Sequence, residues 1–119
     1  MNHPDFFSVL KAHNWTLSDA PQHCPHVYIA ESPCKKYIAL FSSYFYSTTP
    51  LANFCIITAE RYAEVRTEWE TYAKAYVAKY GIRPARSIID LARKGDIVRG
   101  FTDSTIGEVN MFLRMAAED

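Results

Sequence analysis

The sequence predicts a single α+β domain over residues 1–119, with a short three-stranded antiparallel sheet, one helix before it and three helices after it. Two observations support this prediction. Residues 1–59 contain ten of the seventeen aromatic side chains but only six charged residues, whereas residues 60–119 contain the other twenty charges. Buried strands need few charges, and amphipathic helices display them along one side. The expected element order is α-β-β-β-α-α-α.

Three segments of the first half favour strands. Residues 27–30 form a short apolar run, residues 37–46 form the longest strand candidate, and residues 54–58 are apolar or β-branched. Pro33 lies between the first two, where its fixed φ suits a tight turn. Short links between neighbouring strands favour an antiparallel meander.

Four segments are expected to be helical, namely residues 4–13, 60–80, 84–94 and 104–117. Pro4 and Pro84 suit the first helical position, and Gly81 supplies the end of the second helix. Thr105 and Glu108 have the spacing of a capping box. In the longest helix, side chains recur at steps of three or four and predict one face that packs mainly into the core. That face carries Tyr62, Val65, Trp69, Tyr72, Tyr76 and Tyr80.

Length, charge and cysteine content narrow the class of protein. A chain of 119 residues buries enough surface to fold without a disulfide or a metal. Its net charge of zero argues against broad, nonspecific binding to nucleic acid or anionic membrane. The three cysteines are a poor disulfide framework, and neither a signal peptide nor an apolar run of about 18 residues is evident. A cytoplasmic location is the simplest expectation.

One cluster resembles a metal-ligand set. Thiolates and imidazoles are suitable zinc donors, and four such residues lie within a short stretch. They are His23, Cys24, His26 and Cys34. The spacing lacks the usual C-x₂₋₄-C pair, so a loop with reduced cysteines is the commoner interpretation. A small zinc-stabilised domain or enzyme is therefore only a second alternative. With no nucleophile elbow and no glycine-rich phosphate loop, we expect no catalytic residue and no cofactor.

A basic segment in the second half suggests a first alternative, a domain that contacts nucleic acid. It consists of Arg83, Arg86, Arg93, Lys94 and Arg99. Such residues would contact phosphates before bases. Asp90 and Asp96 offset part of this charge, and the link around Gly95 is too long for a helix-turn-helix. A solvated helix surface explains the same charges.

The tyrosines point to the leading hypothesis, a non-catalytic protein-binding module. Tyr44, Phe45 and Tyr46 alternate along a strand, so they cannot all face one core. Either both sides of the sheet are covered or one side docks a partner. We predict a docking patch of Tyr37, Tyr44, Tyr46 and Thr49. By analogy of size, the module would mask a partner surface, as small inhibitors, immunity proteins and accessory proteins of mobile elements do. The same patch would also suit a homodimer.

Overall fold

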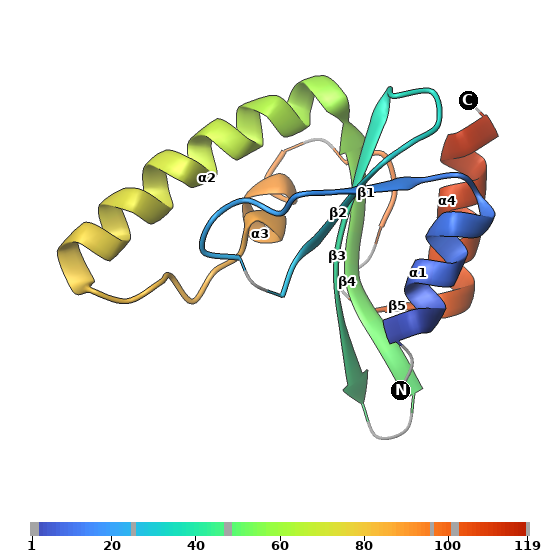
Figure 1. Ribbon diagram of the computed structural model, residues 1–119, viewed down its shortest axis with the longest axis horizontal. Coiled ribbons are helices and arrows are strands. Elements are labelled where there is room, and N and C mark those ends of the chain that lie inside the picture. Colours follow the sequence, from blue (N-terminus) through green and yellow to red (C-terminus); the bar gives the residue numbers. More distant parts are fainter. Residues whose placement is uncertain (1–2, 25, 47–48, 96, 101–102, 119) are drawn as a thin grey trace.

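The computed structural model describes residues 3–24, 26–46, 49–95, 97–100 and 103–118, of which residues 3–5, 43–46, 49–50 and 118 are described by their backbone alone. Figure 1 shows a sheet between two pairs of helices. The elements are α1 (His3–Ala12), β1 (Thr16–Ser18), β2 (Tyr28–Glu31), β3 (Tyr37–Tyr46), β4 (Thr49–Thr58), α2 (Ala59–Tyr80), α3 (Ile88–Ala92), β5 (Ser104–Thr105) and α4 (Ile106–Glu118).

The sheet is antiparallel and its five strands lie in the order β1-β2-β3-β4-β5. The predicted α+β class, the first helix and the C-terminal helices are confirmed, but the prediction of three strands is wrong. The missed strands are the two edges: β1 has three residues and β5 has two, too few for an alternation to be visible. In addition, β4 begins at Thr49, ahead of the expected residue 54, because it pairs along the whole length of β3.

Both faces of the central strands are buried beneath helices. One core cluster joins α1 and α4 to residues such as Phe41 and Phe54, and the other joins α2 and α3 to residues such as Leu40 and Cys55. Consecutive residues along a strand therefore belong to different clusters, because their side chains point alternately to the two faces of the sheet. The apolar run in β4 reflects this double burial, since each side chain has a helix above it.

The helix ends follow local hydrogen-bonding rules. The Thr58 hydroxyl accepts the Arg61 amide at the start of α2, and Gly81 ends it in the left-handed conformation, as predicted. The predicted capping box of α4 is confirmed, since the Thr105 amide donates to the Glu108 carboxylate over 3.0 Å.

The third helix is shorter than its prediction of residues 84–94. It begins after Ser87, whose hydroxyl accepts the Ile89 amide and whose own amide donates to Asp90 over 2.9 Å. This second capping box sets the start of α3, so Pro84 precedes the helix instead of opening it. Within the described residues, no helix is long and apolar enough to cross a bilayer.

Candidate functional site

The predicted docking patch on the sheet is only partly within the described side chains. The side chains of Tyr44, Tyr46 and Thr49 lie outside the described part of the structure. Only the backbone positions of these residues, in the paired strands β3 and β4, are described. Tyr37 is half-buried and packs against the α1–α4 core cluster. Phe41, on the same strand, is fully covered. Where β3 is described with its side chains, helices cover the sheet on both sides.

The four predicted zinc ligands are not brought together. His26 precedes β2 and Cys34 lies in the turn after it, so the length of a strand separates them. Cys24 is buried, whereas Cys34 is exposed. Among the described residues, no group of three or more potential ligands is placed to hold a metal ion. The interpretation of this segment as a four-ligand zinc site is therefore corrected.

The basic segment does not form one surface either. The Arg93 guanidinium donates to the Asn53 side chain and the Phe54 carbonyl, each over 3.3 Å, which ties it to β4. Arg99 pairs through its backbone with Ile56 at the edge of β4. Arg83 and Arg86, by contrast, precede α3 and line a separate pocket. The four arginines of this segment therefore lie in different structural surroundings.

That pocket unites parts of the two predicted sites. Its cavity volume is about 210 Å³, and we call it the His–Arg pocket. Its polar lining consists of His23, His26, Ser42, Arg83, Arg86 and Ser87. The histidines come from the loop before β2 and the arginines from the segment before α3, with 56 residues between His26 and Arg83. Sequence reasoning considered both groups but had no signal that the fold would make them neighbours.

The pKa of the buried thiol of Cys24 reflects the charges around this pocket. Burial raises the pKa of the Cys24 thiol, and the positive charge of Arg83 partly offsets that rise. Asp90 acts in the opposite direction and adds to it. A thiol held in its neutral form is a poor nucleophile and a poor metal ligand. Cys24 therefore contributes to packing in the wall of the pocket.

A second surface lies on the last two turns of α2. Along this helix, three tyrosines form a ladder: ring centroids are 5.9 Å apart between Tyr72 and Tyr76 and 4.6 Å between Tyr76 and Tyr80. The ladder begins against buried Trp69, 5.8 Å from Tyr72. Tyr72 is 38% exposed and Tyr80 55% exposed. The prediction that this stripe packs mainly into the core is thus wrong for Tyr72 and Tyr80, whereas Tyr76 is half-buried.

The reason for this exposure is visible in the ribbon. The far end of α2 runs away from the sheet, so no strand lies close beneath it (Figure 1). We call residues 71–87, the end of α2 and the segment that leads to α3, the distal arm. Ile82, directly after the helix, is 64% exposed and extends the apolar surface.

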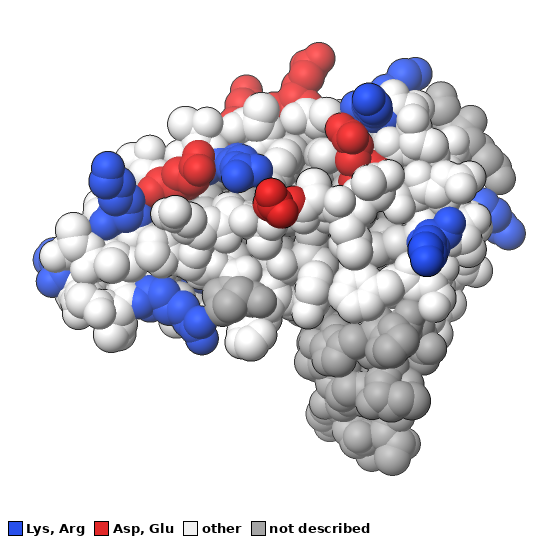
Figure 2. Space-filling model, viewed as in Figure 1, with Lys and Arg blue, Asp and Glu red and all other residues white. Residues whose placement is uncertain are grey.

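The distal arm carries a strong local charge. Lys74, Lys79, Arg83 and Arg86 lie within it, and it contains no aspartate or glutamate. The rest of the chain therefore carries the balancing negative charge, since the whole protein is neutral. Figure 2 shows basic side chains around this end of the molecule and mixed charges along the rest of α2. The Lys79 ammonium lies 5.2 Å from the Tyr80 ring centroid, a cation–π contact.

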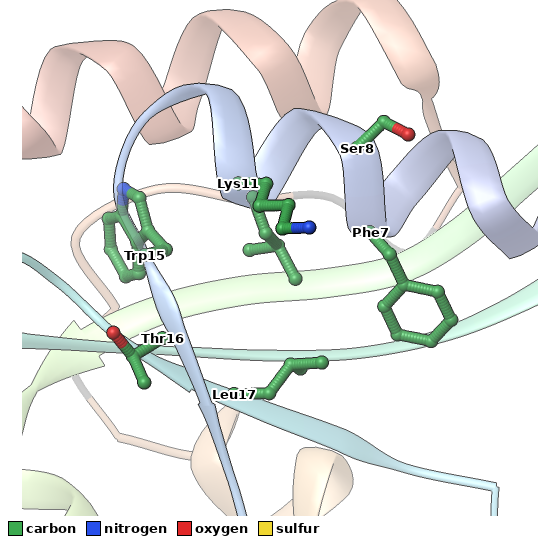
Figure 3. Close-up of a pocket in the computed structure, with 7 residues that line it drawn as sticks. Phe7, Ser8, Lys11, Trp15, Thr16 and Leu17 are labelled. Atoms are coloured by element: carbon green, nitrogen blue, oxygen red, sulfur yellow. The ribbon is translucent and has the colours of Figure 1, made fainter.

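A second hollow lies between α1 and the edge strand β1 (Figure 3). It has a cavity volume of about 570 Å³ and an apolar lining that includes Phe7, Trp15 and Leu17. Lys11 is the one charged residue in this lining. The hollow offers area for contact, but its lining provides few polar groups that would select a ligand.

The tyrosines of the arm had a sequence signal that we interpreted differently. Their helical spacing marked one face, but spacing cannot tell where the sheet beneath the helix ends. The more useful signal is the absence of acidic residues over the same stretch, which is unusual for a solvated helix with an even charge balance. No protein-family model, curated protein or solved structure matches this chain.

Proposed function

We propose that this protein is a non-catalytic protein-binding module that docks an acidic surface of a partner protein on its distal arm. The observation that carries the proposal is the tyrosine ladder, in which Tyr72 and Tyr80 are exposed and Tyr76 is half-buried, inside a stretch with four cations and no carboxylate. Tyrosine supplies a large apolar area and a hydroxyl group, and it is enriched at interfaces. The surrounding cations favour a negatively charged partner.

The tyrosine ladder is also preorganised for binding. Each ring rests against its neighbour, so the side chains lose less rotamer freedom on docking than isolated tyrosines would. The helix itself is held by its buried half, where Val65, Trp69 and Ala73 pack into the core. A rigid helix face with aromatic anchors suits a groove or flat surface on another protein. Docking there would mask the partner surface, which is the mode of action of small inhibitors.

Affinity capture with matched variants tests this proposal. The wild-type protein, a Tyr76→Ser/Tyr80→Ser variant and a Met111→Ser/Met115→Ser control are immobilised and exposed to nuclease-treated native extract. The control removes two exposed apolar residues of α4, on the other side of the sheet. We expect a partner that the wild-type and control proteins retain and the tyrosine variant loses. Raising the salt from about 50 mM to about 500 mM should release that partner, because screening weakens attraction between charges.

The captured protein must then bind in purified form. We expect a Lys74→Gln/Lys79→Gln variant to bind it at least about tenfold more weakly, mostly through slower association. Equal binding by all variants would contradict docking on the arm. Sedimentation of the isolated protein distinguishes a second copy as the occupant: a dimer that Tyr76→Ser/Tyr80→Ser dissociates would replace the foreign partner by self-association.

Single-stranded nucleic acid is a second candidate, favoured by the same combination of tyrosines and cations. Two observations make it the weaker one. The ladder rings already lie against one another, which covers part of the faces on which bases would stack. The whole protein also lacks the basic excess that supplies most nonspecific affinity. Binding of an oligonucleotide pool at about 50 mM salt, with a steep decline as salt rises, would favour this candidate over the protein partner.

A further inference from the structure

The His–Arg pocket has a lining whose basic groups have no partners within the described structure. Arg83, Arg86, His23 and His26 form no hydrogen bond or ion pair with any other described residue. The carboxylate closest along the chain, that of Asp90, is engaged by the Ser87 amide over 2.9 Å. Two guanidinium groups that share one recess repel each other unless an anion lies between them.

Both walls of the pocket are held in place by the core. The indole N–H of buried Trp69 donates to the Gln22 carbonyl over 2.9 Å and fixes the histidine loop. His23 adopts a left-handed conformation with φ of 68°, which requires a stabilising environment. On the other wall, the Ser87 hydroxyl accepts the Ile89 amide and keeps its own proton free to donate. The backbone of both walls is therefore held in place before any ligand arrives.

The chemistry of the lining selects the ligand class. Guanidinium groups bind phosphate oxygens through paired N–H donors, and a neutral imidazole adds one N–H donor. A carboxylate has two oxygens to accept these donors, whereas a phosphate monoester has three terminal oxygens and about two negative charges. The cavity of about 210 Å³ is smaller than sites for whole drug-sized ligands, and it suits a single terminal group.

We propose that the His–Arg pocket binds a phosphate monoester group, with Arg83 and Arg86 as the principal ligands and His23, His26 and Ser87 as additional donors. The group could belong to a phosphorylated side chain or to a free phosphorylated metabolite, since both present the same three oxygens. Arg83 and Arg86 also belong to the distal arm, but the proposal is tested independently of docking there, because a free phosphate compound can fill the pocket with no protein partner present.

Nuclear magnetic resonance of the ¹⁵N-labelled full chain tests the proposal directly. Inorganic phosphate, phenyl phosphate and a phosphoserine peptide are titrated separately, with sodium chloride at matched ionic strength as the blank. We expect saturable shifts of the amides of residues 22–24, 26–27, 83 and 85–88 with all three phosphates and none with chloride. Tighter binding of the peptide than of phenyl phosphate identifies a phosphorylated side chain as the source, and the reverse order identifies a small metabolite.

Two variants complete the test. Arg83→Gln/Arg86→Gln should weaken phosphate binding at least about tenfold, whereas Arg114→Gln, at an exposed arginine of α4, should leave it unchanged. Because Arg83 and Arg86 are exposed, we expect the double variant to fold, and the shift mapping needs no variant. Shifts that do not saturate, or that spread over all basic residues, would overturn the proposal. So would equal shifts with an oligonucleotide that lacks terminal phosphates.

Discussion

The two aromatic-rich regions of this protein have opposite surroundings. In the central strands, consecutive residues such as Leu40 and Phe41 enter different cores, because helices cover both faces of the sheet. In the distal arm, tyrosines with regular helical spacing lie on a single face, but that face extends beyond the sheet. Aromatic content alone therefore does not distinguish a core from a binding surface. The two are distinguished by whether another layer of the fold packs against the aromatic side chains.

The comparison has a consequence for where the protein can bind partners. The strand aromatics first suggested an exposed sheet face, yet the described part of that face is closed by helices. The helix stripe suggested a core, yet two of its last three tyrosines, Tyr72 and Tyr80, are exposed. Four predictions test this contrast between the core and the exposed regions, and they are arranged from the largest expected effect to the smallest.

The largest effect is expected within the aromatic stripe of α2 itself. Trp69→Ala should lower the free energy of unfolding by about 3–5 kcal/mol, because it empties a fully buried site and removes the hydrogen bond to Gln22. Tyr80→Ala should lower it by less than about 1 kcal/mol, since that ring is half exposed. Urea unfolding measures both values. Similar losses for the two variants would show that the arm is packed like the core.

The two positive-φ glycines provide a second comparison. Gly100 has φ of 135° and packs on β4, where an added Cβ would collide with the Phe54 carbonyl oxygen. Gly81, at the end of α2, has φ of 74° and open space around it. We expect Gly100→Ala to cost about 3 kcal/mol or more and Gly81→Ala about 1 kcal/mol. Thermal unfolding of both variants measures the difference, and a larger loss for Gly81→Ala would contradict it.

Alkaline pH should weaken the core through its buried thiols. Burial raises the pKa of Cys55 from 9.0 to about 12. The unfolded chain therefore releases this proton from about pH 9 upward while the folded chain keeps it, so stability falls as pH rises between these values. We expect a loss of about 2 kcal/mol by about pH 10.5.

Urea unfolding at pH 8 and pH 10.5 measures this loss, and the control is Cys55→Ala. The control should show a clearly smaller decrease between the two pH values, although Cys24, whose pKa burial also raises, leaves part of it in place. An unchanged decrease in the control would remove Cys55 as its source.

The smallest effect on stability, but a clear difference in reactivity, is expected among the three cysteines. A hydrogen bond from the Ser32 hydroxyl lowers the pKa of exposed Cys34, which raises its thiolate fraction at neutral pH. We expect one fast-reacting thiol per folded chain with a disulfide reagent, and none in Cys34→Ser. Labelling of Cys24 or Cys55 at a comparable rate would show that the core opens readily.

Local sequence rules predicted much of the fold. The helix ends at Gly81 and Thr105 follow from side-chain and backbone chemistry within a few residues, so they were visible in the sequence. The start of α3 was misplaced because Pro84 and Ser87 are both plausible first positions, and only the hydrogen bonds of Ser87 decide between them. The edge strands β1 and β5 are stabilised by pairing with distant segments, which no local pattern records.

The candidate sites show the same limit. His23 and Arg83 were identified separately, but their common pocket depends on how the loop before β2 packs against the segment before α3. Cys34 was grouped with His26 by proximity in sequence, although the strand between them holds them apart. The exposure of Tyr80 depends on the direction in which α2 leaves the sheet, a tertiary property that helical periodicity does not contain.

The packing of α1 against α4 sets an order for the protein's assembly during synthesis. His13 contacts Asn110 over 2.7 Å, and the Trp15 indole donates to the Leu113 carbonyl over 3.2 Å. Among the described residues, none beyond Ala92 belongs to the buried cluster on the α2–α3 face of the sheet, so this face can close while later residues are still inside the ribosome. The opposite face requires Ala116 and stays open until then. Late in its translation, a nascent chain would therefore have the α2–α3 face of the sheet already packed. The opposite face would still expose apolar side chains that a chaperone can bind.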